Sequence, residues 1–80
     1  MSKLKPTKKL DCLGLYCPQP VFETRSSIDE LEEGEVLEVK ADDPAAEEDI
    51  KALIEALGEE LLDFHKDGTE LTFIIRKKKR

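Results

Sequence analysis

Proline and glycine divide this chain into short segments of regular length, and their spacing constrains the fold more than any other feature. Proline suits the start of a helix, because its missing N–H needs no partner there and its φ is already helical. Glycine suits the position after a helix, where the backbone often turns left-handed. Pro18 is followed by Gly34, and Pro44 is followed by Gly58. This order predicts two helices, each begun by a proline and ended by a glycine.

Apolar or small side chains recur inside both segments at the spacing of one buried helix face. In residues 18–33 this face is formed by Val21, Thr24, Ile28 and Leu31. In residues 44–57 it is formed by Ile50, Leu53, Ile54 and Leu57. Asp43 is a favourable N-cap for the second helix, and the acidic residues after Pro44 favour its positive end. We therefore expect one helix over residues 18–33 and a second helix that begins at Pro44 and ends before Gly58.

Four other segments have the alternating apolar and polar residues that are typical of β-strands. They are residues 7–12, 35–41, 60–66 and 70–77. Asp67-Gly68, between the last two segments, is a strong signal for a two-residue hairpin turn. The predicted order of elements is therefore βαβαββ.

This order predicts a two-layer α/β (α+β) sandwich, in which two helices cover one face of a four-stranded mixed sheet. The first two strands should be parallel, because a helix connects them, and the last two should be antiparallel. The 80 residues are expected to form a single domain, with residues 1–7 and 78–80 as frayed tails. A domain of this size buries only about 60% of its unfolded surface, so an active site would be a shallow surface feature.

Acidic and basic residues are distributed unevenly along the chain. The net charge is −6, and every Asp and Glu lies between Asp11 and Glu70. Nine of the 13 basic residues lie outside that span, namely Lys3, Lys5, Lys8, Lys9, Arg76, Lys77, Lys78, Lys79 and Arg80. The predicted topology places both basic ends at one pole of the sheet and Cys17 at the opposite pole.

The sequence has no long apolar segment. No apolar run approaches the ~18 residues of a membrane-spanning helix, and the N-terminus lacks the apolar core of a signal peptide. We therefore expect a cytoplasmic protein, in which cysteine thiols stay reduced.

Cys17 is the main candidate for a reactive residue. It directly precedes Pro18, which puts it at or beside the N-cap of the predicted helix. The positive end of a helix stabilises a thiolate and should lower the pKa of the thiol. Asp42 and Asp43 end the second strand at the same edge and oppose this effect. The alternative for Cys17 is a small buried apolar residue, and the local sequence leaves both possibilities open.

The two cysteines and His65 allow three further interpretations. A structural zinc site is disfavoured, because Cys12, Cys17 and one histidine cannot supply four ligands. A Cys17–His65 catalytic dyad is disfavoured, although the late position of His65 in its strand does not exclude it. A disulfide or redox switch between Cys12 and Cys17 is geometrically possible, but we favour a structural role for Cys12.

Two charged segments also have an ordinary structural interpretation. The basic residues 76–80 could bind nucleic acid or an acidic partner, which would make the chain a small regulatory or binding module. A solvated chain end is favoured, because no aromatic residues accompany the lysines and the rest of the chain is acidic. Helix capping explains Asp43, and a metal site would need more oxygen ligands than Asp42 and Asp43 supply.

The segment that contains both cysteines resembles a known family signature. Residues 10–21 read Leu-Asp-Cys-Leu-Gly-Leu-Tyr-Cys-Pro-Gln-Pro-Val and are similar to the N-terminal signature of the TusA/SirA-like sulfur-carrier family, with its Cys-Pro-x-Pro motif. The similarity continues through residues 34–35, 42–44, 49–50 and 73–77, and it covers roughly residues 9–77.

The resemblance implies a fold and a function. It implies the βαβαββ sandwich, and a Cys17 that accepts sulfane sulfur as a persulfide from a donor protein such as a cysteine desulfurase or a rhodanese. The sulfur would then pass to an acceptor protein in tRNA thiolation, cofactor assembly or sulfur metabolism. Such a protein is a sulfur carrier rather than a multiple-turnover enzyme with its own substrate pocket. It needs no cofactor, no metal and no membrane, and nucleic acid is not its expected partner.

The resemblance also suggests roles for residues near Cys17. Pro18 and Pro20 would stiffen the helix start, and Gly14 would let the preceding loop turn close to the thiol. Arg25 matches a position that is usually basic in the family and could contact a partner. The family motif does not require Cys12, so its role is left open.

Overall fold

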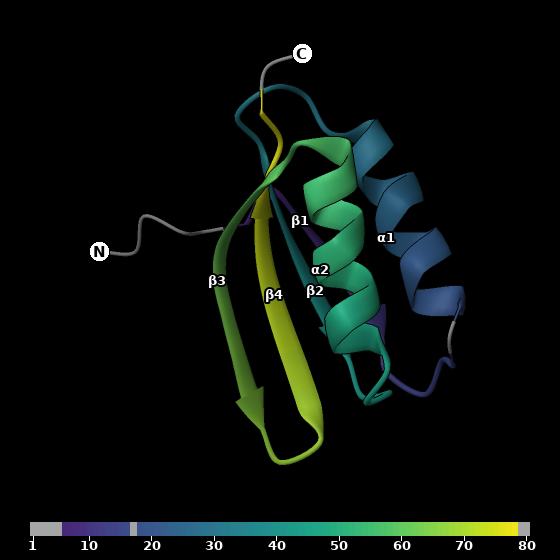
Figure 1. Cartoon of the computed structure of the whole chain (residues 1–80). Coiled ribbons are helices and arrows are strands. Elements are labelled where there is room, and N and C mark those ends of the chain that lie inside the picture. Colours follow the sequence, from purple (N-terminus) through teal and green to yellow (C-terminus); the bar gives the residue numbers. More distant parts are fainter. Residues whose placement is uncertain (1–5, 17, 79–80) are drawn as a thin grey trace.

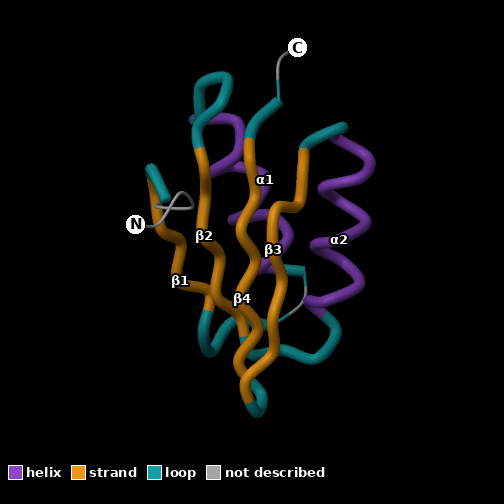
Figure 2. The backbone as a smooth tube through the Cα atoms, turned by 90° about the vertical axis from the view of Figure 1, so that its left-hand side faces the viewer, coloured by secondary structure: helices purple, strands orange, loops and turns teal. Residues whose placement is uncertain are grey.

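The computed structural model describes residues 6–16 and 18–78. The elements are β1 (Lys8–Cys12), α1 (Gln19–Glu30), β2 (Val36–Ala41), α2 (Ala46–Leu57), β3 (Glu60–Asp67) and β4 (Glu70–Arg76). Both helices lie on one side of the four-stranded sheet, as Figures 1 and 2 show. The predicted two-layer sandwich with βαβαββ order is therefore confirmed. Neither described helix is long and apolar enough to cross a membrane.

The strands lie in the order β1-β2-β4-β3. β1 and β2 are parallel, whereas β4 is antiparallel to both of its neighbours. The strands β1, β2 and β3 therefore end at one edge of the sheet, which we call the carboxyl edge. Both helices also begin there, at the lower end of the molecule in Figure 1. At the opposite end of the sheet, which we call the amino edge, β1 begins and β4 ends. The predicted topology likewise placed both basic chain ends at one pole.

The core lies between the helices and the inner face of the sheet. Phe73, at the centre of β4, is completely buried, and its ring lies 5.0 Å from that of Phe64, centroid to centroid. The other core side chains come from both helices and from every strand; the buried ones are Cys12, Ile28, Leu31, Leu37, Val39, Ala41, Ala46, Ile50, Ile54, Leu71 and Ile75. Each large apolar side chain buried here contributes about 1.5–3 kcal/mol.

The first helix begins one residue later than predicted and ends three residues earlier. Pro18 is the N-cap rather than the first helical residue, with φ −97° and ψ 15°. The helix ends at Glu30, because Leu31 takes an extended conformation that places its side chain in the core. Gly34 has a φ of +86° but does not cap the helix. It belongs to a turn in which the Glu35 N–H donates to the Glu32 carbonyl oxygen at 2.9 Å.

The second helix begins two residues later than predicted. The Asp43 carboxylate accepts a hydrogen bond from the Ala45 N–H at 3.1 Å, and the Asp43 carbonyl accepts one from the Ala46 N–H at 2.8 Å. These bonds form a turn through Pro44 and Ala45, so that Ala45 is the N-cap. Gly58, in the left-handed conformation, ends the helix as predicted.

The strands agree with prediction to within one residue at each end. The hairpin turn lies one residue later than expected, because Asp67 pairs with Glu70 and leaves Gly68-Thr69 as the two-residue loop. Before β1, the Thr7 N–H donates to the Val36 carbonyl at 2.7 Å, which continues the pairing of the strand backward. The remainder of both expected tails, residues 1–5 and 79–80, lies outside the described residues.

Candidate functional site

The candidate site is the connection between β1 and α1 at the carboxyl edge. Cys17, the predicted sulfur-bearing residue, lies outside the described residues, but Tyr16 and Pro18 on either side of it are described. The Gln19 N–H donates to the Tyr16 carbonyl at 2.8 Å, and the Phe22 N–H donates to the Pro18 carbonyl at 3.1 Å. The backbone at Tyr16 and at Pro18 is therefore anchored to the first turn of α1.

The first half of this connection is held by two aspartates. The Leu13 N–H donates to the Asp11 carboxylate at 2.9 Å, and the Gly14 N–H donates to the Asp42 carboxylate at 3.0 Å. Gly14 has a φ of +82°, and a Cβ there would meet nothing within 4 Å. Glycine is therefore required by the backbone conformation and not by a lack of space.

Asp42 is a positioning residue that sequence reasoning missed. The sequence suggested only that its charge opposes a thiolate, whereas its carboxylate fixes the loop that leads toward residue 17. Its place directly after β2 was the available signal, because adjacent parallel strands end side by side. Cys12 and Ala41 are indeed register partners at the ends of β1 and β2.

The two prolines and Arg25 lie in different environments. Pro18 is exposed at the N-cap, whereas Pro20 is buried under the first turn of α1. Pro20 therefore anchors the helix start by packing, in addition to restricting the backbone. Arg25 is exposed, one helical turn beyond Val21 and Phe22.

Cys12 is a free thiol in the core, at the end of β1. Burial raises the pKa of this thiol from 9.0 to about 11, and the nearby carboxylates of Glu23 and Asp11 add to the effect. The thiol is therefore protonated at neutral pH and unsuited to nucleophilic attack. Its place in the core fits a structural role, and a disulfide switch would first have to expose it.

His65 and the β1–α1 connection belong to opposite edge strands of the sheet. It lies on the edge strand β3 and pairs with Thr72, on the face of the sheet opposite the core residues Phe64 and Phe73. Its side chain is 59% exposed, with Nδ1 3.6 Å from the Asp63 carboxylate. The β1–α1 connection follows the other edge strand and leads to the helical side of the sheet. This arrangement gives no support to a dyad between His65 and a thiol beside α1.

The described part of the chain has no group of three or more His, Cys, Asp or Glu side chains that could hold a metal ion.

The fold and this connection can now be compared with known proteins. A family model described as "Sulfurtransferase TusA" matches residues 8–77, nearly the whole chain. The chain belongs to the TusA family. A relative from Archaeoglobus fulgidus, whose assigned name is that of a sulfur carrier protein, is 52% identical over 71 residues, which cover 86% of this chain and 91% of the relative. A Bacillus subtilis relative named as the sulfur carrier YrkI is 40% identical over 74 residues, which cover 92% and 99% of the two chains.

A solved structure shows the same architecture. The SirA-like protein from Desulfitobacterium hafniense superimposes with a TM-score of 0.78 over 90% of this chain and 99% of that chain, at 26% identity. The mixed sheet with two helices on one face is thus shared with a structure determined independently of this sequence.

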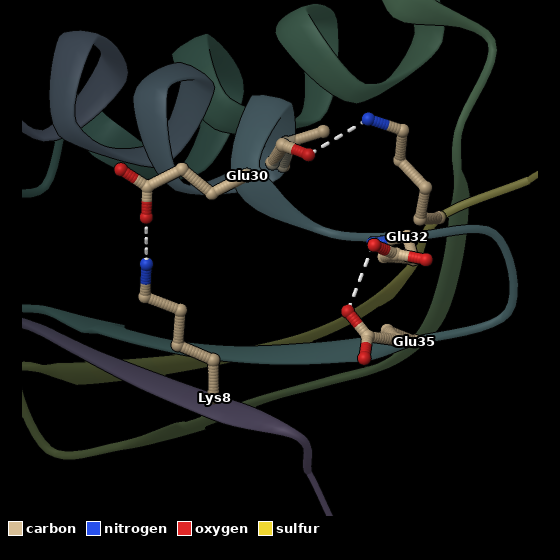
Figure 3. A network of polar contacts seen from close by, with 6 residues as sticks. Lys8, Glu30, Glu32 and Glu35 are labelled. Carbon is tan, nitrogen blue, oxygen red and sulfur yellow. Dashed lines mark hydrogen bonds and ion pairs between the residues drawn. The ribbon is translucent and has the colours of Figure 1, made fainter.

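Three of the basic residues at the amino edge of this TusA-family chain have side-chain partners. The Arg76 guanidinium lies 2.6 Å from the Glu60 carboxylate. Lys77 is buried and donates from Nζ to the Ile28 carbonyl at 2.8 Å, near the end of α1. Figure 3 shows this end of the molecule, where Lys8 also pairs with Glu30. These contacts reduce the charge available to a polyanion, so the structure does not favour nucleic-acid binding through the described part of the basic tail.

Proposed function

We propose that this chain is a sulfur-relay carrier that accepts a sulfane sulfur on Cys17 and passes it to a partner protein. The observation that carries the proposal is the position of Cys17 in a TusA-family chain, directly between Tyr16 and the N-cap residue Pro18 of α1. The donor would be a protein persulfide, as formed by a cysteine desulfurase or a rhodanese. The acceptor would act in tRNA thiolation, cofactor assembly or sulfur metabolism.

The proposed transfer is a balanced exchange at sulfur. The Cys17 thiolate attacks the outer sulfur of a donor persulfide, R–S–SH, and the S–S bond of the donor breaks. The donor leaves as the thiolate R–S⁻, and Cys17 carries –S–SH with the original proton. An acceptor thiolate then attacks the outer sulfur and releases the Cys17 thiolate. No external oxidant, reductant or cofactor is consumed.

The start of α1 favours such an anion. The first turn of α1 contains no acidic residue, so the positive end of the helix dipole is not offset from within the helix. A thiolate or persulfide anion next to this end would be stabilised, and its nucleophilic form would be more populated at neutral pH.

The choice between the cysteines also supports Cys17. Cys12 is completely buried, and its raised pKa keeps it protonated. An exchange with a protein partner needs an accessible thiolate, which Cys12 cannot supply without local unfolding.

Mass spectrometry after incubation with a cysteine desulfurase and L-cysteine tests the proposal. We expect a gain of ~32 Da per added sulfur atom that is lost in Cys17→Ser and retained in Cys12→Ala, because exchange requires the attacking thiolate. Alanine is the better control at position 12, since a serine hydroxyl would be buried there. A wild-type chain that gains no sulfur from a desulfurase, a rhodanese or inorganic polysulfide would contradict the proposal.

A further inference from the structure

Three large apolar side chains are exposed around the candidate site. Among the described residues, the large hydrophobic side chains left open to solvent are Tyr16 (78% exposed), Phe22 (61%) and Leu13 (42%). All three lie within ten consecutive positions that include residue 17. An aromatic side chain in solvent forgoes the roughly 1.5–3 kcal/mol that its burial would contribute. We call these three residues the apolar patch.

A shallow groove continues the patch onto α2. It has a volume of about 370 Å³ and is lined by Pro18 and Val21 from α1 and by Asp49, Ala52 and Leu53 from α2. Phe22 lies one helical turn beyond Pro18, to whose carbonyl its N–H is bonded. The patch and the groove therefore meet at the first turn of α1.

Carboxylates border this surface and are bonded to its residues. Asp11 accepts the Leu13 N–H, and Asp42 accepts the N–H of Gly14. Glu23, just beyond the first turn of α1, accepts a hydrogen bond from the Gln19 side chain at 3.3 Å. The basic chain ends lie at the opposite, amino edge of the sheet. The described surface at the β1–α1 connection thus has an apolar centre bordered by these carboxylates, with the exposed Arg25 one helical turn beyond Phe22.

We propose that the apolar patch and the groove form the docking surface for a sulfur-donor protein whose persulfide-bearing face is apolar at its centre and lined by Lys and Arg at its rim. This inference rests on the proposed sulfur-relay function. Charge complementarity selects the partner, because opposite rims attract and speed association. A second copy of this chain would place two acidic rims against each other, and nucleic acid or an anionic membrane would be repelled.

The test compares protein-driven and chemical loading of sulfur. The rate of the ~32 Da gain per sulfur is measured with limiting cysteine desulfurase plus L-cysteine, and separately with inorganic polysulfide, which needs no docking. Phe22→Ser removes an exposed ring from the patch. Glu23→Lys reverses a rim charge, and Glu55→Lys, at an exposed position near the far end of α2, is its matched control.

We expect Phe22→Ser to lower the desulfurase-driven rate about tenfold, as for a central interface aromatic, with polysulfide loading unchanged. The loss should disappear at saturating desulfurase, since docking affects KM and not the transfer step. Glu23→Lys should slow association and weaken its salt dependence, whereas Glu55→Lys should do neither.

Several results would overturn the inference. Equal desulfurase-driven rates for wild type and Phe22→Ser would remove the docking surface and leave the sulfur-relay proposal intact. The docking surface would also be contradicted if polysulfide loads the wild type but the desulfurase does not. A wild-type dimer in sedimentation that Phe22→Ser dissociates would contradict it as well. Neither result would affect the sulfur-relay proposal. A wild-type chain that no donor loads would contradict the sulfur-relay proposal itself.

Discussion

The two strand-to-helix connections of this protein start from equivalent places and differ in charge. Cys12 at the end of β1 and Ala41 at the end of β2 are register partners, and each connection leads into a helix on the same face of the sheet. The first turn of α2 contains Glu47, Glu48 and Asp49, whereas that of α1 contains no acidic residue. One helix dipole is thus compensated by the chain itself, and the other is left for an anion that residue 17 or a partner would supply.

The two connections also differ in their ion pairs. The Glu47 carboxylate lies 3.0 Å from Lys51 and 3.4 Å from Lys66. The hydrogen bond from Lys51 lowers the pKa of Glu47 most, and the bond from Lys66 adds to it. The start of α2 therefore forms a closed network of charges. The contrast teaches that two helix starts at the same edge can differ in role. The start of α2 is neutralised by its own acidic residues, whereas the start of α1 is open to an anion.

The largest predicted effect tests whether the buried thiol before α1 is structural. The pKa of Cys12 is about 11 in the folded protein against 9.0 for an unperturbed thiol. Because the folded value is raised, the stability from this protonated thiol is fully present below about pH 9 and is lost as the pH rises through about 11. Two pKa units correspond to about 2–3 kcal/mol.

Denaturant titrations at several alkaline pH values measure this effect. We expect the free energy of unfolding of the wild type to fall by about 2–3 kcal/mol more than that of Cys12→Ala over this window. The difference between the two proteins removes the contribution of lysines that titrate in both. Parallel pH curves for the two proteins would show that Cys12 is not held protonated by burial.

The second prediction concerns the buried faces of the helices. α2 buries Ala46, Ile50 and Ile54, whereas α1 buries Thr24, whose hydroxyl has no hydrogen-bond partner in the described structure. A buried unpaired hydroxyl costs about 1–3 kcal/mol, and valine has nearly the same shape. Thr24→Val should therefore raise the unfolding free energy by about 1–2 kcal/mol, and it should raise the midpoint of thermal unfolding accordingly. An unchanged or lowered midpoint would mean that this hydroxyl is satisfied in solution.

The third prediction separates two adjacent aspartates. Asp42 holds the β1–α1 connection through Gly14, and Asp43 holds the turn before α2 through Ala45. Each alanine substitution should lower the unfolding free energy by about 1 kcal/mol, as is typical for a lost capping bond. Only Asp42→Ala should also change the rate of sulfur loading, because its loop leads to residue 17. Equal loading rates for the two variants would show that Asp42 does not position the loop for sulfur loading.

The smallest predicted effect comes from a substitution that gives the first turn of α1 an acidic residue, as in α2. Gln19→Glu introduces a carboxylate into the first turn of α1, where the dipole interaction is about 0.3–1 kcal/mol. The pKa of the Cys17 thiol, measured from the pH dependence of its alkylation rate in Cys12→Ala, should rise by about 0.5 units. Glu48→Gln in α2 is the control and should leave that pKa unchanged. A pKa that does not respond to Gln19→Glu would show that the start of α1 does not activate the thiol.

The sequence contained most of the information about the fold, because hydrophobic periodicity and the proline and glycine positions are local signals. It misplaced the end of α1, since Leu31 is helical in pattern but is drawn into the core in an extended conformation. It also misjudged Gly34, whose left-handed conformation serves a turn between Glu32 and Glu35. Tertiary packing decided both positions, and no local pattern encodes it.

For the candidate site, the sequence proposed candidate residues but not the contacts between them, and it missed the positioning role of Asp42. The bond from Gly14 to Asp42 joins positions 28 residues apart and depends on the parallel register of β1 and β2. The burial of Cys12 and the exposure of Tyr16 and Phe22 likewise follow from the three-dimensional structure. A periodic pattern shows that one helix face is apolar, but it does not show which apolar side chains remain open to a partner.

The most direct test of the sulfur-carrier proposal localises sulfur in a chain that retains both cysteines. The wild-type protein is loaded by a cysteine desulfurase, its thiols are blocked by alkylation, and the peptide that contains Cys12 and Cys17 is fragmented in a mass spectrometer. We predict the added sulfur, ~32 Da, on fragments that contain Cys17 and none on fragments that contain Cys12 alone. Added sulfur on Cys12 rather than on Cys17, or a peptide that gains no sulfur from the desulfurase, a rhodanese or inorganic polysulfide, would contradict the proposal that Cys17 carries the sulfur.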